Sequence, residues 1–101
     1  MSQANSLVDP EVRALVSAGR ARVFVMLHVP ETAGQVQRPS AIGRVQDEVL
    51  ARLPQSHASL IRRYASVPML ALEIDATAVR VLETMTDLVA GVKRDRTVVP
   101  Q

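Results

Sequence analysis

With 101 residues, the chain is long enough for one domain with its own buried core, and it contains no cysteine. The lack of cysteine excludes disulfides, thiol catalysis and cysteine-rich zinc sites. Its 12 basic and 10 acidic residues are spread along the sequence, so the net charge of +2 does not by itself indicate a nucleic-acid partner. The longest apolar run, VFVML, is far shorter than the roughly 20 residues of a membrane span, so we expect a soluble protein with no membrane partner.

The N-terminal part predicts a short helix followed by a strand. Asp9 is a suitable N-cap, Pro10 fits the first helical position, and Gly19 suits a left-handed helix exit. The next run, RARVFVMLHV, is rich in β-branched residues and apolar on both faces, which indicates a central strand. Alternation puts Val23, Val25, Leu27 and Val29 on one face and Phe24, Met26 and His28 on the other.

The middle of the chain predicts one helix and one β-hairpin. The helix is expected to start with Ser40 as its cap and to end before Pro54. Its apolar positions follow the helical period at Ile42, Val45, Val49, Leu50 and Leu53. The runs ASLIRRYAS and MLALEI, separated by Val67 and Pro68, predict two antiparallel strands.

The last part predicts a helix and a final strand. Asp75 is a suitable cap, and the helix is expected to carry an apolar stripe and to end at Gly91. That stripe comprises Val79, Leu82, Met85 and Val89. The short charged run VKRD is typical of an edge strand. The order strand, helix, strand, strand, helix, strand predicts an α+β ferredoxin-like sandwich, with a four-stranded antiparallel sheet, two helices on one face and the short N-terminal helix in addition.

In such a sandwich one face of the sheet is left without helices. Alternation places apolar residues and a pair of charges on this open face, namely Phe24, Met26, Met69, Ala71, Lys93 and Asp95. A contiguous apolar patch on a small protein typically marks an interaction surface, which here could meet a partner protein or a second copy of the chain. The two charges fit partner contacts and equally fit solvated groups that protect an edge strand.

Two stretches, RRYASVPMLALEID and LVAGVKRD, resemble the subtilisin propeptides, the prosegment domains of the subtilase serine protease family. The resemblance covers residues 22–95 and implies a domain that docks its open sheet face on the protease and feeds its C-terminal tail into the active-site cleft. We therefore divide the chain into a lead-in with a short helix (1–21), an inhibitor-like domain (22–95) and an extended inhibitory tail (96–101). The implied partner is a subtilisin-type protease, in cis as a prodomain that also acts as an intramolecular chaperone, or in trans.

In the tail, the resemblance assigns Gln101, Pro100, Val99 and Val98 to the first, second, third and fourth subsites before the scissile position. Many subtilisin propeptides carry two acidic residues, two apart, on the last strand, where they cap helix N-termini of the enzyme. Asp95 matches the second acidic position, whereas Lys93 replaces the first. The cellular location stays open, cytoplasmic if the chain is complete and secreted if it is an excised prodomain.

Other chemistry finds little support in the sequence. There is no Gly-x-Ser-x-Gly elbow for a serine hydrolase, so we expect no enzyme activity. His28 and His57 lack the paired spacing of a metal site, and no cofactor motif is present. Phe24 is the only aromatic residue expected at the centre of the open face, which argues against RNA stacking. The alternative function is a non-catalytic interaction or regulatory module of the same fold that dimerises through the open face.

Overall fold

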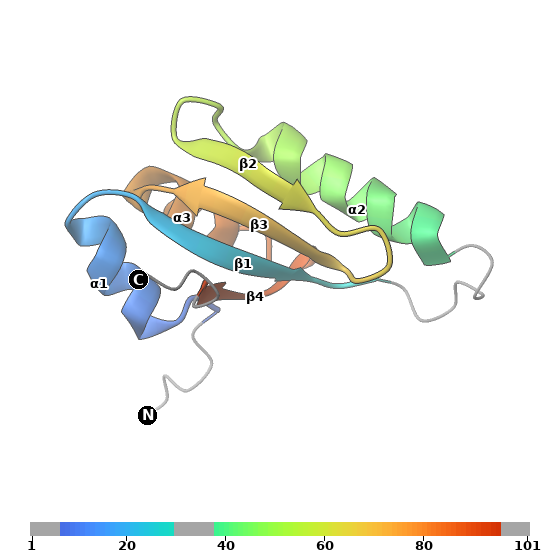
Figure 1. Ribbon diagram of the computed structural model, residues 1–101, viewed down its shortest axis with the longest axis horizontal. Helices are drawn as coiled ribbons and strands as arrows, with labels where there is room; N and C mark the ends of the chain where they lie inside the picture. Colours follow the sequence, from blue (N-terminus) through green and yellow to red (C-terminus); the bar gives the residue numbers. More distant parts are fainter. Residues whose placement is uncertain (1–6, 30–37, 96–101) are drawn as a thin grey trace, which may run out of the picture.

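A computed structural model describes residues 7–29 and 38–95, and the chain there forms an α+β fold in a ferredoxin-like arrangement (Figure 1). The elements in this part of the chain are α1 (Pro10–Ser17), β1 (Ala21–Leu27), α2 (Arg38–Arg52), β2 (Ala58–Arg63), β3 (Met69–Ile74), α3 (Ala76–Glu83) and β4 (Val89–Arg94). This confirms the predicted fold class. Within the described ranges there are three helices and one four-stranded antiparallel sheet.

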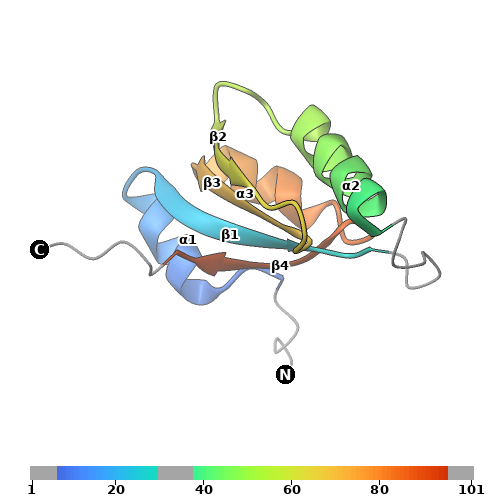
Figure 2. The ribbon, with the colours of Figure 1, turned by 45° about the vertical axis from the view of Figure 1, so that its right-hand side comes forward.

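The strands lie in the order β2-β3-β1-β4. Both central strands are antiparallel to their neighbours, β1 to β3 and β4, and β3 to β2. Each helical crossover therefore joins two parallel strands that are separated by a third, which is the split β-α-β pattern. Figure 2 shows β1 and β4 side by side, and α2 lies toward the β2 edge of the sheet.

One face of the sheet packs against the helices and forms the core. On this covered face Val23, Val25, Leu70 and Leu72 are each 0 % exposed. Val12 of α1 belongs to the same core cluster and is also 0 % exposed. The helix predicted inside the lead-in of residues 1–21 is thus packed into the domain.

The N-terminal segment also covers one edge of the sheet. The backbone N–H of Val92 donates to the carbonyl of Leu7 at 2.9 Å, and that of Asp9 donates to the carbonyl of Val92 at 2.9 Å. Arg94 of β4 forms an ion pair with Glu11 of α1, and Arg13 forms one with Glu83 of α3. On the outer edge of β4 the N-terminal segment therefore satisfies both backbone hydrogen-bonding groups of Val92.

Two of the three predicted helix caps, Asp9 and Asp75, are confirmed. The side chain of Asp9 accepts a hydrogen bond from the backbone N–H of Glu11 at 2.9 Å, and Pro10 occupies the first helical turn. Asp75 likewise accepts from the N–H of Ala78 at 3.1 Å. Gly19 has a φ of 153°, which a residue with a side chain rarely adopts.

Two predicted helix boundaries are wrong. α2 begins at Arg38, so Ser40 lies inside the first turn and does not cap the helix. α3 ends at Glu83, so Val89 and Gly91 belong to β4, where they pair with Leu27 and Met26. The second boundary depends on the pairing of β4 with β1, and an apolar period in the local sequence does not show which residues pair with a neighbouring strand.

Candidate interaction site on the open sheet face

The sheet register brings the predicted open-face residues together in two rows. In one row Phe24 of β1 lies between Ala71 of β3 and Lys93 of β4. In the next row Met26 lies between Met69 and Gly91. Phe24, Met26 and Met69 are half-buried, so the face presents a continuous but only partly exposed apolar surface.

Two other predicted members of this surface differ in exposure, because Ala71 is buried whereas Asp95 is half-buried. Ala71 is 3 % exposed, so the prediction that it offers exposed surface is wrong. Its methyl group is too short to rise between Phe24 and Arg62, the residues paired with it on either side. Asp95 is half-buried, and its backbone N–H donates to the carbonyl of Arg22 at 3.0 Å. The chain is therefore still held to β1 where the described residues end.

Tyr64 is a member of the open face that strand parity alone does not reveal. Its ring lies 6.4 Å from that of Phe24, centroid to centroid, with the planes 69° apart. Because β3 runs between β1 and β2, the two rings meet above β3. The expectation that Phe24 is the only aromatic residue here is wrong. The edge-to-face geometry gives a stable pair, although the inclined rings do not form a flat platform for stacked bases.

A β-bulge explains the position of Tyr64. The register of β2 against β3 shifts between Leu60 and Arg62, so the facing of the side chains changes there. Leu60 pairs with Leu72, whereas Arg62 pairs with Ala71. The guanidinium carbon of Arg62 lies 5.2 Å from the centre of the Tyr64 ring, a cation–π contact on the open face.

Gln46 of α2 anchors the hairpin that carries Tyr64. Its side chain is 3 % exposed, and its amide nitrogen donates to the carbonyls of Tyr64 at 2.8 Å and Met69 at 3.1 Å. Its amide oxygen accepts from Nε of Arg63 at 3.2 Å. The sequence signal for this residue was a polar side chain four positions after Ile42, on the apolar side of a helix.

Among residues 7–29 and 38–95, the open face carries the cations Arg22, Arg62 and Lys93 and the acidic residues Glu73 and Asp95. Arg22, Arg62 and Lys93 are exposed, and among residues 7–29 and 38–95 none of them takes part in an ion pair. Glu73 on β3 lies 4.0 Å from Arg20. The face thus combines an apolar centre with cations at its margin.

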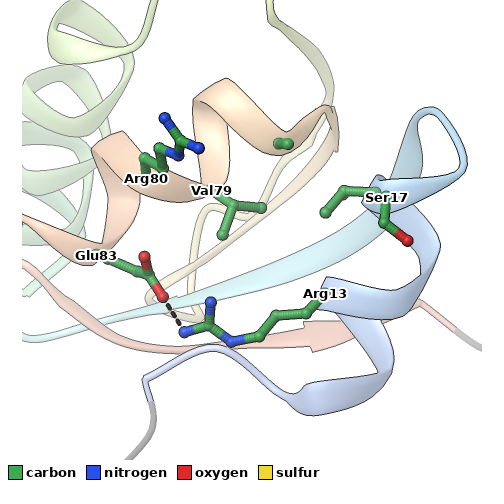
Figure 3. A pocket seen from close by; sticks show the side chains of 7 residues that line it. Arg13, Ser17, Val79, Arg80 and Glu83 are labelled. Carbon is green, nitrogen blue, oxygen red and sulfur yellow. Dashed lines mark hydrogen bonds and ion pairs between the residues drawn. The ribbon is translucent and has the colours of Figure 1, made fainter.

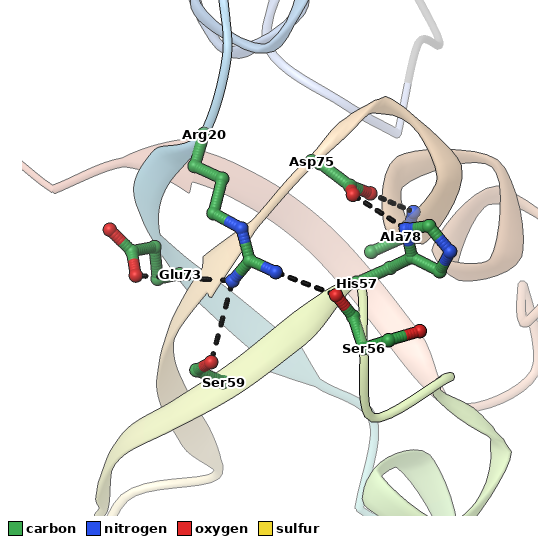
Figure 4. A network of polar contacts seen from close by, with 7 residues as sticks. All are labelled: Arg20, Ser56, His57, Ser59, Glu73, Asp75 and Ala78. Atoms are coloured by element: carbon green, nitrogen blue, oxygen red, sulfur yellow. Dashed lines mark hydrogen bonds and ion pairs between the residues drawn. The ribbon is translucent and has the colours of Figure 1, made fainter.

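A second polar cluster lies at one end of the sheet (Figure 4). Nδ1 of His57 is 2.6 Å from a carboxylate oxygen of Asp75, and this hydrogen bond is the main reason that the pKa of Asp75 lies below its ordinary value. Arg20 donates to the carbonyl of Ser56 at 2.7 Å and lies 3.4 Å from the hydroxyl of Ser59. These contacts tie β1, β2 and α3 together, and neither serine is hydrogen-bonded to His57 as a nucleophile would be.

A pocket of about 230 Å³ lies between α1 and α3, and Figure 3 shows side chains that line it. Its walls include Val16 and Val79, and the Arg13–Glu83 ion pair crosses it.

In the described part of the chain no group of three or more histidine, aspartate or glutamate side chains could hold a metal ion. No described helix is long and apolar enough to cross a membrane.

Comparison of the chain with protein-family models, with curated proteins and with solved structures gave no match.

Proposed function

We propose that the chain is a propeptide-like inhibitor of a subtilisin-type serine protease, and a folding chaperone for that protease when the two are joined. The observation that carries this proposal is the open sheet face, where Phe24, Met26 and Met69 form a continuous apolar surface that no helix of the described chain covers. The resemblance of residues 22–95 to subtilisin propeptides supports it. The ferredoxin-like fold is the one that this resemblance implies.

The inhibition needs no catalytic group on this chain. Docking would bury the apolar part of the open face against the protease, and residues 98–101 would add an extended strand to the substrate-binding strands of the cleft. The proposed tail residues Val98, Val99, Pro100 and Gln101 lie outside the described residues. The hydrogen bond from Asp95 to β1 supports this arrangement because it fixes the point from which the tail departs. Six extended residues span about 20 Å, which suffices to reach a neighbouring cleft.

The test is a titration of protease activity with the full chain and with a version that lacks Thr97 to Gln101. A panel of subtilisin-type proteases, including any from the same source, serves as the set of targets. We expect inhibition by the full chain and its loss on truncation, because the truncated form keeps the docking face but has no tail to occupy the cleft. If neither form inhibits any protease of the panel, the proposed function is wrong.

A matched pair of variants separates docking from a general loss of apolar surface. Met26→Ser changes the open face, whereas Leu60→Ser changes a residue that is 47 % exposed and pairs with Leu72 of the covered face. We expect Met26→Ser to weaken inhibition by about tenfold and Leu60→Ser to leave it unchanged. Equal effects would show that the open face is not the docking surface.

The second candidate is a module that dimerises through the open face, and the same apolar residues favour it. A two-fold interface joins a patch to its own copy, so it would bring Arg22, Arg62 and Lys93 near the same cations of the partner. This repulsion makes the dimer the weaker candidate. Sedimentation equilibrium over a range of concentrations decides between them: the dimer requires association that Met26→Ser abolishes, together with no effect on any protease.

A further inference from the structure

The open face carries cations for which the described fold supplies no carboxylate. Five arginines of the described chain form ion pairs with acidic side chains: Arg13 with Glu83, Arg20 with Glu73, Arg52 with Glu48, Arg63 with Asp47 and Arg94 with Glu11. Arg22, Arg62 and Lys93 have no such partner within residues 7–29 and 38–95. They are exposed, and the register places them on one surface.

The arrangement of these cations has the form of an interface. Arg62, Ala71, Phe24 and Lys93 stand in one row across the four strands, so the two cations flank the aromatic centre. Three strand spacings separate them, which is about 14 Å between their backbones. Arg22 lies two residues before Phe24 on β1 and adds a third cation on the same side of the sheet. An apolar centre with a charged margin is typical of surfaces that bind another protein.

The acidic residues of this face do not balance the cations. Glu73 lies within ion-pair distance of Arg20, and Asp95 already has interactions of its own. A partner that covers the face therefore meets positive charge on both sides of Phe24. Covering an unpaired cation is unfavourable unless the partner supplies an acceptor of opposite charge.

We propose that the protease surface on which this face docks presents carboxylates opposite Lys93 and Arg62. This inference rests on the proposed function and deepens it by naming the chemistry of the partner surface. It differs from docking on helix N-termini, which carry partial positive charge and favour acidic residues. A protease that presents helix N-termini at this position would repel Lys93, whereas one that presents aspartate or glutamate side chains would bind it.

The sign of the effect of Lys93→Glu tests the proposal. The inhibition constant of the full chain is measured for the wild type and for Lys93→Glu, on the protease of the panel that the wild type inhibits most strongly. We expect the variant to inhibit at least about tenfold more weakly, because an attraction becomes a repulsion. Wild-type inhibition should also weaken as the salt concentration rises, and the variant should lose this dependence in part.

Two other cations provide matched controls. Arg44 on α2 and Arg80 on α3 are exposed and, like Lys93, take part in no ion pair of the described chain. Neither belongs to the sheet, so Arg44→Glu and Arg80→Glu change the net charge equally without changing the open face. We expect both to inhibit like the wild type. Arg62→Glu should weaken inhibition as Lys93→Glu does.

Each other outcome would overturn the proposal in a recognisable way. If Lys93→Glu inhibits equally or more strongly, the carboxylate surface is wrong while the inhibitor function stands. If the wild type inhibits no protease, both proposals are wrong. A single-stranded oligonucleotide that binds the wild type, in a manner lost in Lys93→Glu and without any protease inhibition, would assign the cations to a nucleic acid instead.

Discussion

The two faces of the sheet are built from the same strands but differ in burial and in composition. On β1, Val23 and Val25 are 0 % exposed beneath the helices, whereas Phe24 and Met26, which alternate with them, are half-buried on the open face. The covered face contains the aliphatic core, and the open face carries the aromatic pair and three cations that form no ion pair within the described residues. Because side chains alternate along a strand, residues that form the core and residues that belong to the proposed docking face alternate and can be changed separately.

The largest expected effect is on the covered face. Leu72 is 0 % exposed, so Leu72→Ala should lower the free energy of unfolding by about 2–5 kcal/mol because it leaves a cavity. Met69→Ala is the matched control, three residues earlier on the same strand and half-buried on the open face, and should cost about 1 kcal/mol. Equilibrium unfolding in urea measures both. Equal losses would show that the two faces contribute alike to stability.

Gln46 of α2 connects the two faces, because it is buried on the covered side and donates to the backbone of Tyr64 and Met69, whose side chains lie on the open face. Gln46→Leu keeps the shape but removes the donor for the carbonyls of Tyr64 and Met69 and the acceptor for Arg63. We expect a loss of about 1–3 kcal/mol in the free energy of unfolding, the cost of leaving buried polar groups unpaired.

The same variant should disturb the open face, and the chain provides its own reporter for this. Tyr64 is its one tyrosine and there is no tryptophan, so the tyrosine signal in near-ultraviolet circular dichroism reports the packing of this ring. Gln46→Leu should weaken the signal under conditions where the protein stays folded. Val45→Ala, the neighbouring position on α2, should leave it unchanged. An unaltered signal in Gln46→Leu would mean that the ring is held by Phe24 and Arg62 alone.

Local rules of sequence account for much of the fold. The caps Asp9 and Asp75 were predictable because a short acidic side chain before a helix accepts from free backbone N–H groups. The buried face of β1 was predictable because apolar residues alternate there. The start of β4 at Val89 was not predictable, because the apolar spacing of α3 extends as far as Val89. Only the pairing of Val89 with Leu27 shows that this residue belongs to a strand.

The candidate site was predictable only in part, for the same reason. Phe24, Met26 and Met69 follow from alternation within regular strands. Tyr64 lies beyond a β-bulge, and the position of a bulge depends on the pairing of two strands, which local sequence does not contain. The cations were visible as residues, but that none of them forms an ion pair within residues 7–29 and 38–95 is a property of the folded chain. The tail assignments stay predictions.

The smallest expected effect is on the stability of the end of the sheet, where Asp75 follows β3 and caps α3. His57 and Asp75 are joined twice, by the 2.6 Å side-chain contact and by a 3.1 Å bond from the N–H of Asp75 to the carbonyl of His57. Since the pKa of Asp75 is lowered in the folded state, mainly by His57, folding favours its ionised form. Its contribution to stability is therefore present above the ordinary aspartate pKa, roughly 4, and is lost as the pH falls through the lowered value.

Asp75→Asn isolates this contribution, because asparagine still caps a helix but carries no charge. The wild type should have a higher urea midpoint than the variant at about pH 5, and the difference should shrink toward about pH 3. The difference should be small, since the two side chains are 39 % and 26 % exposed and solvent screens the pair. A constant difference over this range would show that the carboxylate acts only as a cap. In that case the link between β2 and α3 would rest on the backbone hydrogen bond from Asp75 to His57, and the pH would not affect how firmly this end of the sheet is held.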